Sequence, residues 1–148
     1  MKLSYLVSAS VAVAAVSYGV LLMAHGGDVP EAGKPMQYFK QASKMDIKSM
    51  GVKDTNAYLS DVVGSHDAKA PISCGFFKID KGNSLTYTYD YDEAKIITAG
   101  EMNVNDGTQT VKAVPGDVLF FPVGSTITFS SDSSGTGFIC GQREIDGA

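Results

Sequence analysis

The sequence predicts an all-β fold, a barrel or jelly roll made of short strands. The chain of 148 residues contains 16 glycines, and from residue 72 onward short runs of β-branched and aromatic residues alternate with turn residues. The runs expected to be strands are 72–79, 85–91, 94–98, 101–104, 108–114, 118–122, 126–130 and 137–143. Many short strands at this spacing are typical of a closed barrel or a double-sheet jelly roll.

Turn chemistry separates these runs. Four segments contain residues that tolerate positive φ: 80–83 (Asp-Lys-Gly-Asn), 105–107 (Asn-Asp-Gly), 115–117 (Pro-Gly-Asp) and 132–135 (Asp-Ser-Ser-Gly). The segment 115–117 also contains a proline, which fixes φ. The run 85–91, Leu-Thr-Tyr-Thr-Tyr-Asp-Tyr, alternates strictly, so its aromatic side chains should share one face of a strand.

The first 34 residues do not show the strand-and-turn pattern of the later part of the chain. Residues 1–24 carry one charge, Lys2, and then an apolar run, as a secretory signal peptide or an uncleaved membrane anchor would. Residues 25–34, with three glycines and a proline, resemble a linker, and 35–148 are predicted to be one domain that begins with a short N-terminal arm and a helical turn near 37–44. We therefore expect a secreted protein, or a cytoplasmic one if Met23 is the true start.

The charge distribution argues against nucleic-acid binding, and the cysteine content leaves open whether the chain forms a disulfide. The net charge is −4 and the lysines are scattered, so a phosphate-binding stripe is missing and nucleic acid is not an expected partner. Cys74 and Cys140 lie in apolar strand-like runs, where they are either two buried thiols or a disulfide formed after secretion.

Two spaced patterns between residues 82 and 131 resemble the two motifs of the cupin family. Glu93, six residues and Gly100 match the second half of the first motif, and Gly116, five residues and the tripeptide Pro-Val-Gly at 122–124 match the second. In cupins these glycines and prolines make turns between barrel strands. The resemblance implies a cupin-type β-barrel, also called a double-stranded β-helix or jelly roll.

The chain departs from the family at the metal ligands. Cupins hold their metal with three histidines and a glutamate, and this chain has two histidines, His25 and His66, neither of which lies in a motif. The three histidine positions are taken by other residues, namely Tyr87, Tyr89 and Ile127. Without imidazole the site loses the ligand type best suited to zinc, iron, nickel or copper, so we expect no metal and no other cofactor.

A closer resemblance is to the cupin of the ethanolamine-utilisation operon and its small stand-alone relatives. In that family an Asp-Glu pair opens the strand before the motif glycine, as Asp92-Glu93 does in the run 91–100, and the run 115–129 is also similar. The usual histidines are missing there too. Acetate kinase activity has been ascribed to the bacterial member, whereas this chain has no glycine-rich phosphate loop of recognisable form, so the resemblance implies a fold and a pocket.

Strand alternation predicts which side chains face the barrel interior, while Asp90 and Asp92, on the opposite parity, should face solvent. The expected inward-facing residues are Tyr87, Tyr89, Glu93, Lys95, Ile97, Ile127 and Phe129. Glu93 is the candidate acid or base, and Tyr87 and Tyr89 are candidate donors to a carbonyl or enolate oxygen. Lys95 can pair with Glu93, which is equally consistent with a structural ion pair, and the tyrosines can equally be core residues.

Four residues are candidates for ligand binding: Ile97, Ile127, Phe129 and Arg143. Arg143 can anchor a carboxylate or form a surface salt bridge. Three kinds of function fit such an aromatic pocket. They are a metal-independent lyase or isomerase acting on a small carbonyl or phenolic compound, a ligand-binding or accessory protein without turnover, and a structural or interaction module. An open strand edge favours a homodimer, and contact with a membrane is expected only through an uncleaved leader.

Overall fold

The computed structural model describes residues 34–65 and 67–148. Gln37–Ala148 form one compact unit, and of a second unit, Met1–Met36, only residues 34–36 are described, without regular secondary structure. The predicted leader, all but the last residue of the predicted linker, and His66 lie outside the described residues, so the statements made about them stay predictions. No helix in the described ranges has the length and apolar character needed to cross a bilayer.

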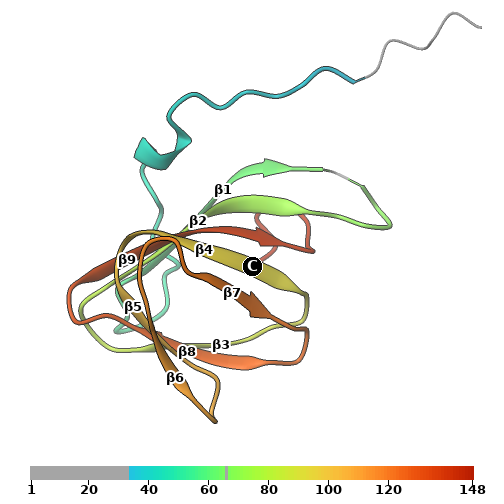
Figure 1. The fold of residues 1–148 in the computed structure, drawn as a ribbon. Helices are drawn as coiled ribbons and strands as arrows, with labels where there is room; N and C mark the ends of the chain where they lie inside the picture. The colour runs from blue at the N-terminus through green and yellow to red at the C-terminus, as the bar shows by residue number, and fades with distance from the viewer. Residues whose placement is uncertain (1–33, 66) are drawn as a thin grey trace, which may run out of the picture. The chain divides into compact units, whose positions relative to one another are not determined.

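Nine strands and one short 3-10 helix lie in the part of this unit that the structure describes. They are η1 (Ala42–Lys44), β1 (Ala57–Gly64), β2 (Ser73–Asp80), β3 (Leu85–Thr88), β4 (Glu93–Gly100), β5 (Met102–Asn105), β6 (Thr110–Ala113), β7 (Val118–Phe121), β8 (Thr126–Ser130) and β9 (Ser134–Gly141). Five strands form a sheet in the order β1-β2-β9-β4-β7, and four form a sheet in the order β3-β8-β5-β6. The sheets lie face to face as two layers, with antiparallel pairing throughout, and this confirms the all-β prediction (Figure 1).

The segment before residue 72 contains a strand that the sequence analysis missed. Residues 36–60 were expected to be an irregular arm, but β1 begins at Ala57 and pairs along its length with β2. A β-bulge between Asp61 and Val63 shifts the register, which breaks the simple alternation by which a strand is recognised in a sequence. The predicted helical turn near 37–44 is present as η1.

The ends of most strands differ from the prediction by a residue or more, and β3 and β9 differ most. β3 stops at Thr88 instead of continuing to Tyr91, because the amide and carbonyl of Tyr89 bond to the turn at Ser125 and Gly124. β9 begins at Ser134, within the predicted turn 132–135, and it ends at Gly141. A glycine is required at Gly100, opposite this start, because its φ is +65° and a Cβ there would overlap the carbonyl oxygen of Ser134.

The hydrophobic core fills the space between the two sheets. Its members are Ala57, Phe77, Ile79, Leu85, Tyr89, Tyr91, Ile97, Met102, Val104, Ala113, Phe121, Ile127, Phe129 and Ile139. Most of them alternate along the strands with side chains that face outward, as period-2 strands require. The core therefore places one face of each strand toward a shared interior, which is where the polar residues described below are found.

A disulfide joins the two cysteines. Cys74 in β2 and Cys140 in β9 are directly opposite each other in the antiparallel register, with a Cα–Cα distance of 4.1 Å, and both are half-buried. Of the two alternatives left open by the sequence, the structure has the disulfide and not two free thiols.

Candidate functional site

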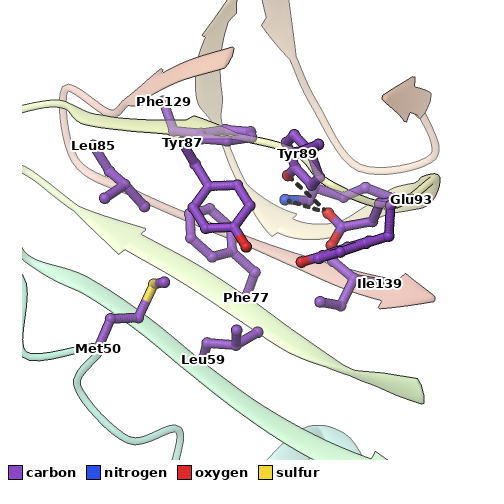
Figure 2. A pocket seen from close by; sticks show the side chains of 11 residues that line it. Met50, Leu59, Phe77, Leu85, Tyr87, Tyr89, Glu93, Phe129 and Ile139 are labelled. Atoms are coloured by element: carbon purple, nitrogen blue, oxygen red, sulfur yellow. Dashed lines mark hydrogen bonds and ion pairs between the residues drawn. The ribbon is translucent and has the colours of Figure 1, made fainter. Parts of the chain in front are cut away.

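A small cavity lies between the sheets, beside the start of β4 (Figure 2). Its volume is about 20 Å³, which gives room for about one water molecule. Its lining residues come from both sheets, from the segment before β1 and from the connection between β3 and β4. They are Met50, Leu59, Phe77, Leu85, Tyr87, Tyr89, Tyr91, Glu93, Lys95, Phe129 and Ile139. The cavity is mostly apolar, with a few polar groups gathered at one place, as in many small-molecule sites.

Glu93 is the centre of that polar group. It is the first residue of β4, its side chain is 3% exposed, and its Oε1 accepts a hydrogen bond of 3.0 Å from the hydroxyl of Tyr89. The Nζ of Lys95 lies 3.3 Å from the same oxygen. Within the described part of the chain, no hydrogen bond reaches the other carboxylate oxygen, Oε2. Oε1 of Glu93 is therefore held by two contacts, whereas Oε2 has no hydrogen bond from the described residues.

Lys95 is buried within an aromatic surround. Strand alternation places it on the same face as Glu93, and its Nζ lies 4.1 Å from the ring centroid of Phe77 and 4.4 Å from that of Phe129. Burial lowers the pKa of the Lys95 ammonium because it removes water from the charge, although the carboxylate of Glu93 opposes this. Gly137 of β9 makes the space, since a Cβ there would come within 2.9 Å of the Lys95 Cγ.

Three tyrosines form the wall next to Glu93. The ring centroids of Tyr87 and Tyr89 are 4.9 Å apart and those of Tyr89 and Tyr91 are 5.5 Å apart, both edge-to-face. Burial, and next the charge of Glu93, raise the pKa of Tyr89, and burial also raises the pKa of Tyr91. Both phenols therefore stay protonated at neutral pH and can act as hydrogen-bond donors.

The structure brings together five of the eight candidate site residues and separates three from them, namely Ile97, Ile127 and Arg143. Tyr87, Tyr89, Glu93, Lys95 and Phe129 all line the cavity. Ile97 and Ile127 also face inward, at 1% and 3% exposed, but they lie in the core and are not among the lining residues. Asp90 is exposed and Asp92 is half-buried, its carboxylate accepting a hydrogen bond from the Val123 amide.

Arg143 is bound within the protein. Its guanidinium makes two hydrogen bonds, of 2.7 and 2.8 Å, to the carboxylate of Asp61, and its side chain is 4% exposed. It does not line the cavity, although its Cζ lies 5.6 Å from the ring centroid of Tyr91, which does. Of the two uses expected for Arg143, the salt bridge is present, but it is buried and not on the surface.

Several lining residues were missed in the sequence. Met50 and Leu59 belong to the segment read as an arm, and Figure 2 shows them side by side at the edge of the site. Phe77 and Ile139 are in predicted strands, and counting their parity from the core would have placed them inside. The glycines of β9 were a further signal, because Gly137 leaves room for Lys95 and Gly141 leaves room for the ring of Tyr91.

The residues of the site do not fit the metal of the wider cupin family. Residues 34–65 and 67–148 contain no group of three or more His, Cys, Asp or Glu that could hold an ion. The three histidine positions hold Tyr87, Tyr89 and Ile127, and Glu93 is bonded to Tyr89 and Lys95. One carboxylate beside an amine is a poor donor set for a divalent transition metal, so these residues do not fit that metal.

Comparison with known proteins identifies the family. The family model described as "Ethanolamine utilisation protein EutQ" matches residues 34–140, most of the chain. The chain belongs to the EutQ family. It is 36% identical over 76 residues to the protein named "Acetate kinase EutQ" from Escherichia coli K12, and the match covers 51% of this chain and 32% of that protein. The chain therefore spans about a third of the length of the curated relatives it matches.

Solved structures show the same fold for this EutQ-family chain. A putative EutQ protein from Salmonella typhimurium LT2 superposes with a TM-score of 0.52 at 30% identity, covering 58% of this chain and 68% of that one. A cupin superfamily protein from Desulfitobacterium hafniense DCB-2 gives a TM-score of 0.54 at 15% identity, covering 75% and 94%. The cupin fold predicted from the glycine and proline motifs is thus confirmed.

Proposed function

We propose that this EutQ-family cupin binds a small carbonyl or phenolic compound in the cavity beside Glu93. We further propose that it acts on this compound as a metal-independent lyase or isomerase by proton transfer. The observation that carries the proposal is the Glu93 carboxylate, which is buried in an apolar cavity and bonded at one oxygen to Tyr89 and Lys95. A carboxylate within reach of a bound molecule can take and return a proton, while a tyrosine hydroxyl donates to the oxygen where charge develops.

The size of the cavity restricts the ligand. Room for about one water molecule accommodates only a very small compound without rearrangement. Tyr87, Met50 and Leu59 are half-buried and so are the side chains with most freedom to move aside. A binding protein without turnover is the alternative, since the same contacts hold a ligand whether or not a proton moves.

Thermal shift with defined probes tests the binding step. We expect acetate or glycolaldehyde to stabilise the protein, since a ligand at a hundred times its Kd adds about 2.7 kcal/mol to the free energy of unfolding. Acetate belongs in the set because the relatives are named acetate kinases. Tyr89→Phe and Glu93→Gln should each reduce the ligand-induced shift, measured against the variant's own ligand-free midpoint.

The matched control is Asp90→Asn, because Asp90 is exposed and outside the cavity. Equal shifts in Asp90→Asn and in both site variants would contradict binding at Glu93. For a carbonyl probe that binds, proton NMR in D₂O separates the two functions: exchange of its α-hydrogens that depends on Glu93 indicates turnover, and binding without exchange indicates an accessory protein.

We also propose a homodimer that uses an apolar patch on the outer face of the five-stranded sheet. The apolar patch consists of Ile96, Val118 and Phe120, which are 40%, 69% and 62% exposed. Ile96 pairs directly with Val118, and β7 is the edge strand of its sheet. Exposed apolar clusters of this kind are often interaction sites.

Sedimentation equilibrium tests the dimer. The wild-type chain should be a dimer, and Phe120→Glu should shift it toward monomer because it places a charge within the apolar patch. The control is Val52→Glu, since Val52 is 44% exposed and lies outside the patch. A monomeric wild type, or equal behaviour of the two variants, would contradict the patch as an interface.

The disulfide supports a proposal for location. Disulfides persist in oxidising compartments and are rare in the cytosol. We propose that the chain is secreted or enters the secretory pathway, with Cys74 and Cys140 joined there.

A further inference from the structure

Lys95 has an amine that proton transfer through Glu93 leaves unused. Its side chain is 1% exposed, and among the lysines that the structure describes it is the only buried one. Lysine is almost never fully buried unless it is paired, and its single ionic partner among the described residues is Glu93. A surface lysine contributes to solubility, but an amine on the wall of a cavity does not, so its position needs another explanation.

The surroundings of this amine favour its neutral form more than those of a surface lysine. The rings of Phe77 and Phe129 lie on its sides and Phe121 lies 5.3 Å away, so no water shell surrounds the charge. Cation–π attraction and the Glu93 carboxylate favour the ammonium, whereas the loss of its hydration on burial disfavours it. Nζ and Oε1 lie 3.3 Å apart, close enough for the two groups to exchange a proton directly.

A neutral amine held next to an acid is the arrangement that carbonyl condensation requires. Desolvated lysines serve as nucleophiles toward carbonyl carbons in enzymes that form Schiff bases. The polar groups close by are Glu93, in contact with Nζ, and the hydroxyl of Tyr89, which donates to the same Glu93 oxygen. The cavity volume of about 20 Å³ limits the carbonyl compound to one or two carbons.

We propose that Lys95 forms a reversible imine with an aldehyde of one or two carbons, with Glu93 as the proton carrier. The lone pair of Nζ attacks the carbonyl carbon, the C–N bond forms, and the electron pair of the C=O π bond passes to oxygen, which takes a proton from the protonated Glu93. The nitrogen returns one proton to Glu93. The resulting carbinolamine loses its hydroxyl as water with that proton, and the nitrogen lone pair forms the C=N bond.

This inference rests on the proposed function only for the cavity, and it sharpens the substrate class. An iminium carbon withdraws electrons more strongly than a carbonyl carbon, so in a two-carbon aldehyde a hydrogen on the adjacent carbon becomes easier for Glu93 to remove. The proposed substrate is therefore a small aldehyde, and the proton transfer follows covalent capture.

Reductive trapping tests the imine on the intact chain. The protein is incubated at pH 7 with acetaldehyde and sodium cyanoborohydride, and peptide mass mapping locates the N-ethyl groups. We expect Lys95 to be labelled about tenfold faster than Lys53, an exposed lysine in the same sample, because ordinary lysines are almost fully protonated at this pH. Lys53 is an internal control that needs no variant and so does not depend on a variant's folding.

Two further experiments test whether the cavity is the cause of the faster labelling at Lys95. Pivalaldehyde, which is too bulky for the cavity, should label Lys53 and leave Lys95 unmodified. Glu93→Gln should slow labelling at Lys95 and leave the rate at Lys53 unchanged, since only the former uses the carboxylate. An unmodified Lys95 in folded protein whose Lys53 is labelled by acetaldehyde would overturn the proposal, and so would labelling of Lys95 by pivalaldehyde at the same rate.

Failure of the imine and failure of the proposed function give different results. If Lys95 is not labelled but a small probe still produces a thermal shift that depends on Glu93, the imine is wrong and noncovalent binding stands. If no probe gives such a shift and Lys95 is not labelled, both are wrong.

Discussion

Replacing Arg143 with methionine will lower the free energy of unfolding by about 3–5 kcal/mol, because it leaves a buried carboxylate without its partner. The side chains of Arg143 and Asp61 are 4% and 2% exposed, and two hydrogen bonds of 2.7 and 2.8 Å join them. The amide of Asp146 also donates to Asp61, at 2.7 Å, so the pair ties β1 to the end of the chain. Chemical denaturation at pH 7 measures the loss.

Two controls test whether the loss comes from the unpaired charge. Adding Asp61→Leu to Arg143→Met should recover most of the stability, because replacing both partners of a buried pair by apolar residues is often neutral. Lys112→Met, which removes an exposed partner of Glu101, should have little effect. A loss that persists undiminished in the double variant would indicate that packing of the Arg143 stem, and not its charge, stabilises the protein.

The Asp61–Arg143 pair also makes the free energy of unfolding depend on pH. Burial alone would raise the pKa of Asp61, but hydrogen bonds from Arg143 and the Asp146 amide, together with the charge of Arg143, hold that pKa below its usual value. A carboxyl whose folded-state pKa is depressed contributes stability above its unfolded pKa, about 3.9, and loses it as pH falls through the folded value. The difference between wild type and Arg143→Met should therefore shrink below about pH 4.

Reduction of the disulfide will cost the protein about 4 kcal/mol. Cys74 and Cys140 are separated by 66 residues, and in the chain-entropy model a loop of that length restricts the unfolded chain by about this amount. The denaturation midpoint of the wild type should fall when a reductant is added. Cys74→Ala combined with Cys140→Ala should show the lower midpoint without reductant and should not respond to it.

The double alanine variant and the reductant together separate the effect of the disulfide bond on stability from the effect of packing of the two side chains. Both cysteines are half-buried, so their truncation to alanine loses limited apolar contact beyond the bond itself. A wild type shown by mass to be oxidised, but with the same midpoint in reductant, would contradict a stabilising role for the disulfide.

Strand parity and turn chemistry were readable from local sequence. All eight predicted strands exist, and Glu93, Lys95 and Ile97 share the interior face because side chains on a strand repeat every two residues. The motif glycine Gly100 has a positive φ that only a glycine adopts easily, so it is recognisable without knowing its partner. These features depend on a residue and its immediate neighbours.

Only the tertiary structure decided which residues far apart in the sequence come into contact. Arg143 binds Asp61, which lies 82 residues away in the sequence. Cys140 in β9 is bonded to Cys74 in the neighbouring strand β2, and Met50 lines the cavity from a segment that was predicted to be an arm. No local pattern encodes such contacts, because the order of strands in a sheet follows from how the whole chain closes its core. The sequence by itself determined a cupin barrel with a carboxylate inside it, and the packing of the two sheets decided that this carboxylate shares a cavity of one-water size with a buried amine.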